Sequence, residues 1–214
     1  MIITRKELGS MHRIRRLNIV NSITGVKPAN LIGTRSLSGS DNVAIFSSVV
    51  HLGSDPPLIG FVSRPKGEVA RHTLENISET KKFTINHVRT DLVANAHLTS
   101  AKFKRDESEF EKCGIENEFI NGFHAPFVRQ SEVKIAMSLK DRVPIESNGT
   151  VLIIGEVEFV FIEPTALTEE GYIDLEFSRS AGISGLNSYY ALKKLSDFPY
   201  ARPENAEEIL ENGR

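Results

Sequence analysis

The sequence predicts a mainly β protein, an antiparallel barrel with one or two covering helices. The clearest signal is the alternation of apolar and polar residues over 133–139. A second, longer strand-like run covers 151–162, and Asn148-Gly149 supplies a tight turn before it. Helical patterns are few and short. Strands of this length in such a chain tend to bend and close on themselves, which favours a barrel.

The first part of the chain predicts one amphipathic helix followed by three strands. Residues 13–24 place apolar side chains on one face at three-residue steps, and Gly25 is positioned to end the helix. Strand-like runs follow at 31–35 and 43–51, and the turn-forming residues between them predict a hairpin. After an Asp-Pro-Pro break, the apolar run 58–62 suits a strand that is buried on both faces.

The middle of the chain predicts two helices around a further strand. Apolar residues at i, i+3, i+4 and i+7 predict a helix over 69–80, and residues 83–88 alternate like a strand. A second short helix is expected to begin with Thr90 or Asp91 as its cap. Residues 101–129 are charged and irregular, which predicts an excursion over the surface.

We expect one domain over residues 1–200, including the N-terminal helix, and a polar tail over 201–214. From Pro164 onward the sequence is polar, and its final stretch has too few apolar residues to form a core element. No repeat period and no low-complexity linker divides the chain.

Charge and cysteine content exclude several classes of protein. The 26 Lys and Arg residues against 28 Asp and Glu give a net charge of −2, without the basic excess that nucleic-acid binding requires. The single cysteine, Cys113, can form neither an internal disulfide nor a Cys-based zinc site. The N-terminus carries charges where a signal peptide needs an apolar run, and no segment approaches the length of a membrane span. We therefore expect a cytoplasmic protein that binds neither nucleic acid nor membranes.

Common catalytic and nucleotide-binding motifs are absent from the sequence. It contains no G-x-G-x-x-G, no Walker-type phosphate loop, no H-E-x-x-H and no G-x-S-x-G. No two of its six histidines are three or four residues apart, so none offers a pair of metal ligands on one helix face. The sequence thus predicts no metal site and no catalytic side-chain constellation.

Hydroxyls, amides and cations are concentrated between residues 34 and 76. A phosphate monoester is bound by such groups, because cations neutralise it, hydroxyls donate hydrogen bonds to it, and the free N–H groups at a helix N-terminus favour an anion. The alternative is that loops are rich in Ser, Thr and Asn in any protein, and that basic loop residues are simply solvated. The residues concerned are Thr34, Ser36, Ser38, Ser40, Asn42, Ser47 and Ser48 near the hairpin, and Ser63, Arg64, Lys66, Arg71 and Thr73 near the following helix.

The order of several segments resembles the flavin reductase-like family, which has the FMN-binding split barrel. The segments are Asn30–Thr34, Asn42–His51, Asp55–Pro65, Arg71–Ile77 and Phe83–Asn86, with Gly155-Glu156-Val157 in the long strand and looser matches at Arg179, Gly182 and Tyr189. The resemblance therefore covers most of residues 13–190. Each segment is weak by itself, and the family order with compatible gaps makes the set specific.

The resemblance implies a Greek-key antiparallel split β-barrel with flanking helices, which dimerises and holds FMN non-covalently near the subunit interface. In such proteins the strand equivalent to Asn42–Ser48 lies along the isoalloxazine, and residues equivalent to Ser63, Arg64, Arg71 and Thr73 take the phosphate. The cofactor-binding residues that we expect are Thr34, Ser36, Ser38, Asn42, Ala44, Ile45, Phe46, Ser47, Ser48, Ser63, Arg64, Pro65, Arg71, His72, Thr73, Asn76, Arg179 and Tyr189.

Some of these assignments have an alternative. Asn76 can equally be a packing or helix-surface residue. Arg179 and Tyr189 would approach either the flavin or the nicotinamide.

The function implied by the resemblance is that of an NAD(P)H-dependent flavin reductase, which passes electrons to a small-molecule or protein acceptor. Hydride transfer from nicotinamide to flavin is the chemistry of the cofactor, so no acid–base dyad is required. One alternative is a flavoredoxin-like electron carrier that reacts poorly with NAD(P)H. Another is a barrel without flavin that serves as a ligand-binding or interaction module.

Overall fold

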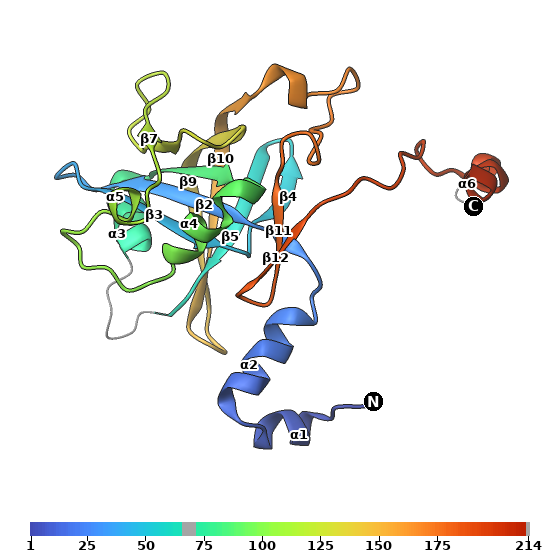
Figure 1. The fold of residues 1–214 in the computed structure, drawn as a ribbon, viewed down its shortest axis with the longest axis horizontal. Coiled ribbons are helices and arrows are strands. Elements are labelled where there is room, and N and C mark those ends of the chain that lie inside the picture. The colour runs from blue at the N-terminus through green and yellow to red at the C-terminus, as the bar shows by residue number, and fades with distance from the viewer. Residues whose placement is uncertain (66–71, 213–214) are drawn as a thin grey trace.

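Seven antiparallel strands form the central sheet of the computed structural model, which describes residues 1–65 and 72–212 (Figure 1). The strands are β2 (Asn30–Arg35), β3 (Asp41–Phe46), β4 (Val50–Ser54), β5 (Pro57–Ser63), β6 (Lys82–His87), β9 (Val133–Ile145) and β10 (Thr150–Ile162). Their order in the sheet is β3-β2-β6-β9-β10-β5-β4. The predicted first hairpin (β2–β3), the strands at 58–62 and 83–88, and the long hairpin β9–β10 are all confirmed.

The sheet curls, which brings its two ends together. Phe46 on β3 and Phe61 on β5 lie near opposite ends of the strand order, yet their ring centroids are 4.9 Å apart. Phe61 also contacts Phe83 on β6, at 5.6 Å between centroids. Since edge strands and central strands share one apolar core, the sheet encloses that core as a split barrel, as the sequence predicts.

The prediction of a single strand over 43–51 is wrong. β3 ends at Phe46 and pairs with β2, whereas β4 begins at Val50 and pairs with β5 at the opposite edge of the sheet. In the crossover, the Ser48 hydroxyl accepts a hydrogen bond from the Val62 N–H at 3.0 Å and donates one to the Val62 carbonyl at 3.3 Å. A side chain therefore replaces the backbone ladder where the chain changes edges.

Close packing inside the barrel explains one glycine of β10. A Cβ atom at Gly155 would lie 2.6 Å from Cζ of Phe83, which is fully buried. Only glycine lets the Phe83 ring lie so close to the backbone of β10.

The helices follow the predicted pattern with two corrections. α2 (Arg13–Ser22) corresponds to the predicted first helix, α1 (Arg5–Ser10) precedes it, and α2 buries none of its residues. α3 (His72–Thr80) packs on β2, and its predicted start lies outside the described residues. The second short helix consists of η1 (Thr90–Leu92) and α4 (Val93–Leu98). Neither Thr90 nor Asp91 caps it, because the helix begins with η1, whose N-cap residue is Arg89 and makes no side-chain cap bond.

The expected surface excursion over 101–129 is wrong, because this segment contributes to two apolar clusters. It contains α5 (Glu109–Lys112), β7 (Asn117–Glu118) and β8 (Phe127–Val128). Apolar residues are scattered among the charged residues of this segment, and several of them are buried. Among these, Phe110, Cys113 and Ile115 are buried in one cluster and Phe127 in another.

The C-terminal part combines one core element with an extended arm. After η2 (Pro164–Ala166), the strands β11 (Ala181–Ser184) and β12 (Ser188–Ala191) form a small sheet with β1 (Lys27–Pro28), and Ala181 and Ile183 are buried. η3 (Pro203–Asn205) and α6 (Ala206–Asn212) lie at the end of an arm that leaves the barrel (Figure 1). In the described part of the chain, no helix is long and apolar enough to span a membrane.

Candidate functional site

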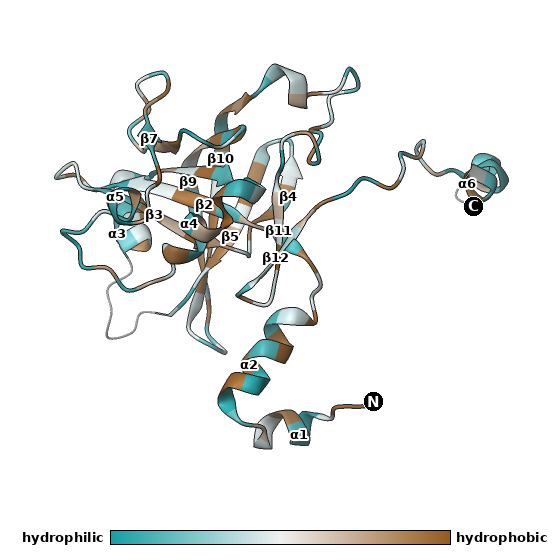
Figure 2. Cartoon of the chain, viewed as in Figure 1, coloured by the Kyte–Doolittle hydropathy of each residue, from teal (hydrophilic) through white to brown (hydrophobic). Residues whose placement is uncertain are grey.

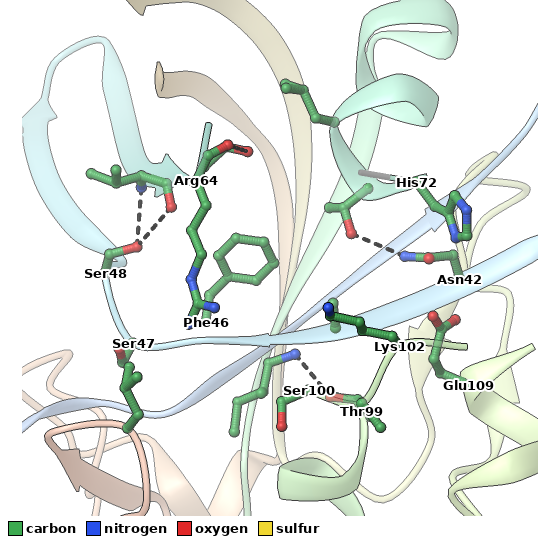
Figure 3. Close-up of a pocket in the computed structure, with 18 of the residues that line it drawn as sticks. Asn42, Phe46, Ser47, Ser48, Arg64, His72, Thr99, Ser100, Lys102 and Glu109 are labelled. Atoms are coloured by element: carbon green, nitrogen blue, oxygen red, sulfur yellow. Dashed lines mark hydrogen bonds between the residues drawn. The ribbon is translucent and has the colours of Figure 1, made fainter. Parts of the chain in front are cut away.

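A cavity of about 470 Å³ opens beside β3, where the chain crosses from one sheet edge to the other. Its walls come from β3 and the crossover, the end of β5, the first residues of α3, the loop after α4, and the turn between β11 and β12 (Figure 3). Segments that are far apart in the sequence therefore meet around one space. Its volume lies within the range of small-molecule sites.

Ten of the predicted cofactor-binding residues line this cavity. Six of them belong to the group of hydroxyls, amides and cations that composition indicates, and four are predicted by the family resemblance alone. The ten residues are Asn42, Ala44, Ile45, Phe46, Ser47, Ser48, Ser63, Arg64, His72 and Thr73. Arg71, which the sequence predicts to bind the phosphate, lies outside the described residues.

Thr34 and Asn76 lie behind the cavity wall and do not line it. The Thr34 hydroxyl accepts hydrogen bonds from the side-chain amides of Asn42 (3.3 Å) and Asn76 (3.1 Å), and the Asn42 amide also donates to the Thr73 hydroxyl at 3.1 Å. Asn76 is buried and ties α3 to β2, which corresponds to the packing alternative. Its Oδ1 atom has no hydrogen-bond partner among the described residues.

Four further predicted residues lie outside the cavity lining. Ser36 and Ser38 lie in the β2–β3 turn, where their hydroxyls are 2.9 Å apart. Pro65 follows Arg64 at the end of a described segment and does not line the cavity. Arg179 forms ion pairs with Asp91 and Glu132 on another part of the surface.

Tyr189 also lies outside the lining, behind the cavity. Its hydroxyl is 3.0 Å from Nδ1 of His97, and its ring packs on the apolar cluster that includes Ile183. The structure therefore brings neither Arg179 nor Tyr189 to the cavity of its own chain.

Several cavity residues are not among those that the sequence predicts. The loop after α4 contributes Thr99, Ser100 and Lys102, and α5 contributes Glu109. The sequence does hold a signal for them, because two hydroxyls and a lysine directly follow a short helix. The interpretation of this segment as a solvated excursion conceals that signal. The turn between β11 and β12 adds Leu186.

Two cations point into the cavity and lack a carboxylate partner. Arg64 and Lys102 both line it (Figure 3), and neither forms an ion pair with a described residue. Ser63, Ser100 and His72 line the same space. Such a set is suited to an anion with several oxygen atoms, because it combines charge with hydrogen-bond donors.

The free edge of β3 is already partly bonded. The N–H of Ile45 donates to the Thr99 hydroxyl at 2.9 Å, and the N–H of Val43 donates to the Glu109 carboxylate. Burial raises the pKa of Glu109 above its usual range, and the bonds from the Val43 and Glu109 N–H groups oppose that shift. Of the strand predicted to contact a flavin, Ser47 remains as a hydroxyl without a hydrogen-bond partner among the described residues.

Another part of the cavity lining is apolar. Phe46 packs edge-on against Phe61, and Ile183 and Leu186 line the wall formed by β11 and the turn that follows it. The cavity thus suits a ligand with a flat apolar body and an anionic end. No three His, Cys, Asp or Glu residues of the described chain are grouped so that they could hold a metal ion.

Comparison with known proteins identifies the relatives of this chain. The family model described as flavin reductase like domain matches residues 26–180. The crystal structure of a candidate flavin reductase with a split barrel domain from Shewanella frigidimarina is 41% identical, with a TM-score of 0.90, and the match covers 94% of this chain and 100% of that one.

Two more distant structures share the fold. Nitrilotriacetate monooxygenase component B from Bacillus cereus is 20% identical, with a TM-score of 0.81, over 92% of this chain and 98% of that one. The flavoredoxin of Desulfovibrio vulgaris is 20% identical, with a TM-score of 0.71, over 82% of this chain and 92% of that one.

Proposed function

The chain belongs to the flavin reductase-like family, and from this premise we propose that it binds FMN in the cavity beside β3 as an NAD(P)H-dependent flavin reductase. The observation that carries the proposal is the meeting of two unpaired cations and an apolar aromatic wall in one cavity. FMN has a matching division, with a dianionic phosphate at one end and a flat ring system at the other.

The two cations of the lining suit the phosphate. Arg64 and Lys102 would neutralise its charge, and the hydroxyls of Ser63 and Ser100 would donate hydrogen bonds to its oxygen atoms. Lys102 comes from a loop that is remote in sequence from Arg64, and the folded chain brings both residues to the lining of one cavity. The Ser63 hydroxyl has only a long bond, 3.5 Å, to the Arg64 carbonyl, and it is available for a ligand.

The apolar part of the lining suits the ring system. Phe46, Ile183 and Leu186 provide apolar surface, and Ser47 provides a free hydroxyl at the crossover. The Ser48 hydroxyl is less suited to a direct contact, because it is bonded to both backbone groups of Val62.

When it is bound, FMN supplies the capacity to accept a hydride from a nicotinamide. The lining residues would then hold the ring in one orientation and exclude water from part of it. Because the hydride chemistry belongs to the cofactor, the proposal assigns no acid–base role to the one carboxyl group of the described lining, Glu109.

The remaining expectations belong to the same proposal. The protein would act in the cytoplasm as a homodimer, and it would pass electrons to a small-molecule or protein acceptor. A flavoredoxin-like carrier would use the same cavity for FMN and differ only in its electron donor.

Absorption spectroscopy tests the proposal directly. Purified protein mixed with FMN and passed over a desalting column should remain yellow, and anaerobic NADH or NADPH should bleach it within seconds to minutes. If the protein retains FMN but only a ferredoxin-like protein donor reduces it, the protein is an electron carrier and not an NAD(P)H-dependent reductase. Failure to retain FMN would refute both.

A further inference from the structure

The C-terminal arm exposes apolar side chains that no part of its own chain covers. From residue 193 to residue 211, no described side chain is buried, Ile209 is partly exposed, and four large apolar side chains are between 52% and 92% exposed. These are Leu195, Phe198, Tyr200 and Leu210. The arm's one hydrogen bond to the barrel, among the described residues, runs from the Lys194 N–H to Glu176 at 3.0 Å. Apolar groups displayed in this way mark an interaction surface.

The end of the arm is also acidic. Residues 203–212 hold Glu204, Glu207, Glu208 and Glu211 and contain no lysine or arginine. None of the four glutamates forms an ion pair with a described residue. Arg202 precedes this stretch and Arg214 follows it, so residues 202–214 hold four glutamates against two arginines, a formal net charge of −2 near the exposed Leu210.

The N-terminal helices have the opposite charge and a similar apolar exposure. α1 and α2 carry five cations, none of them in an ion pair with a described residue, and their one carboxylate, Glu7, is bonded to Thr4. Ile14, Val20 and Ile23 of the same region are exposed, and Figure 2 shows brown bands among teal ones along α2. The five cations are Arg5, Lys6, Arg13, Arg15 and Arg16.

We propose that the acidic end of the arm of one copy of this chain docks on the basic α1–α2 pair of a second copy, and that the second copy returns the same contact. Opposite unpaired charges select this partner surface, and the apolar side chains on both elements supply area to bury. In Figure 1 the arm and the N-terminal helices of one chain project from the barrel in different directions. Because each copy carries both elements, a two-fold dimer forms two identical contacts and closes.

The proposed docking surface is connected to the cavity, because α2 belongs to both. Asn21 is the residue of that helix that lines the cavity, and the side chain of Lys27 donates to its carbonyl oxygen at 2.7 Å. An arm seated on α2 would therefore steady one wall of the site. The docking itself requires no flavin, so its failure and the failure of FMN binding are distinguishable.

Cross-linking of engineered cysteines tests the proposal in the full-length protein. The native Cys113 is buried, so a double variant V20C/L210C offers two reactive thiols, one on α2 and one on α6. Treatment with a short bismaleimide should produce covalent dimers on a denaturing gel as the main product. A link within one chain, or no link, would overturn the proposal.

A matched control keeps the arm cysteine and moves the other one. Val160 lies on β10 and is 45% exposed, close to the 47% of Val20. V160C/L210C should give at least fivefold less covalent dimer, and an equal yield would show that the arm has no preferred surface.

Charge reversal then tests what selects the surface. R13E and R15E added to V20C/L210C should lower the dimer yield at least fivefold, and E207K and E208K in the same chain should restore it. Circular dichroism checks that each variant is folded. A yield that charge reversal leaves unchanged would refute the electrostatic pairing on which the proposal depends.

Discussion

The side-chain amide of Asn42 lies 3.1 Å from the hydroxyl of Thr73, and this hydrogen bond joins β3 to α3 at the wall of the cavity. Both side chains are buried and line the cavity. The residues are separated by 31 positions in the sequence. The bond therefore fixes the distance between the strand predicted to contact the ring system and the helix predicted to contact the phosphate.

Replacing Thr73 with valine should destabilise the protein by about 1–2 kcal/mol, because a buried amide N–H of Asn42 loses its acceptor while the shape of the side chain is kept. Urea unfolding measures this change. Thr73→Ser keeps the hydroxyl and serves as the control, with a smaller loss. A valine variant as stable as the parent would show that this hydrogen bond does not stabilise the folded protein.

Replacing Lys102 with methionine should weaken FMN binding by about 10–100-fold, the value of one charge-assisted hydrogen bond. Riboflavin lacks the phosphate, so its affinity should change far less than that of FMN. Fluorescence titration with both flavins measures the difference. Lys104→Met alters an exposed lysine of the same loop that does not line the cavity, and it should bind FMN normally. Equal losses for both flavins would place the phosphate elsewhere.

Replacing Gly155 with alanine should destabilise the protein by about 1–3 kcal/mol, because the new methyl group would overlap the buried ring of Phe83. Gly9→Ala is the control, since a Cβ atom on this glycine of α1 would meet nothing within 4 Å. That change should be neutral or slightly stabilising. Thermal unfolding of the two variants separates a packing defect from the general effect of removing a glycine.

Acid should destabilise the fold through His87. Burial lowers the pKa of this imidazole to about 4, and its Nδ1 atom lies 3.0 Å from the Ser180 hydroxyl. The unfolded chain takes up a proton below about pH 6.5, and the folded protein does so only below about pH 4. The unfolded state therefore binds more protons in this window, and the free energy of unfolding decreases as the pH falls through it.

The size of that effect can be isolated with His87→Gln, which cannot titrate. Between pH 7 and pH 5 the parent should lose about 2 kcal/mol more unfolding free energy than the variant does. Urea unfolding at the two pH values gives both numbers. Parallel losses in the two proteins would mean that His87 is protonated in the folded state already at pH 5.

Local patterns in the sequence are sufficient for the hairpins. Alternation over 133–139 and 151–162 with a turn between them predicts β9 and β10, and the structure confirms both strands. The same reasoning predicts one strand over 43–51, because the strand-like run continues through Ser47 and Ser48. Periodicity indicates which residues are suited to a strand, but it does not indicate which strand each segment pairs with. It therefore cannot predict that β3 and β4 lie at opposite edges of a curled sheet.

The candidate site is also predicted only in part from the sequence. Composition groups Asn42, Ser47 and Ser48 with Ser63 and Arg64, and these residues meet at one cavity, whereas Thr34, Ser36, Ser38 and Ser40 of the same group do not line it. It misses Lys102, because a lysine in a charged stretch looks solvated until the fold turns that stretch toward the site. The family resemblance places Arg179 near the flavin or the nicotinamide, whereas its ion pairs with Asp91 and Glu132 hold it elsewhere on the chain.

The sequence by itself determined the β class of this protein, its long hairpin and the chemical character of most of the site, because these depend on neighbouring residues and on short-range alternation. Only the tertiary structure decided where the chain crosses between sheet edges, which cations share a cavity and which apolar surfaces remain uncovered. Those features depend on closing long loops into one curled sheet, and contacts between residues far apart in sequence leave no local pattern.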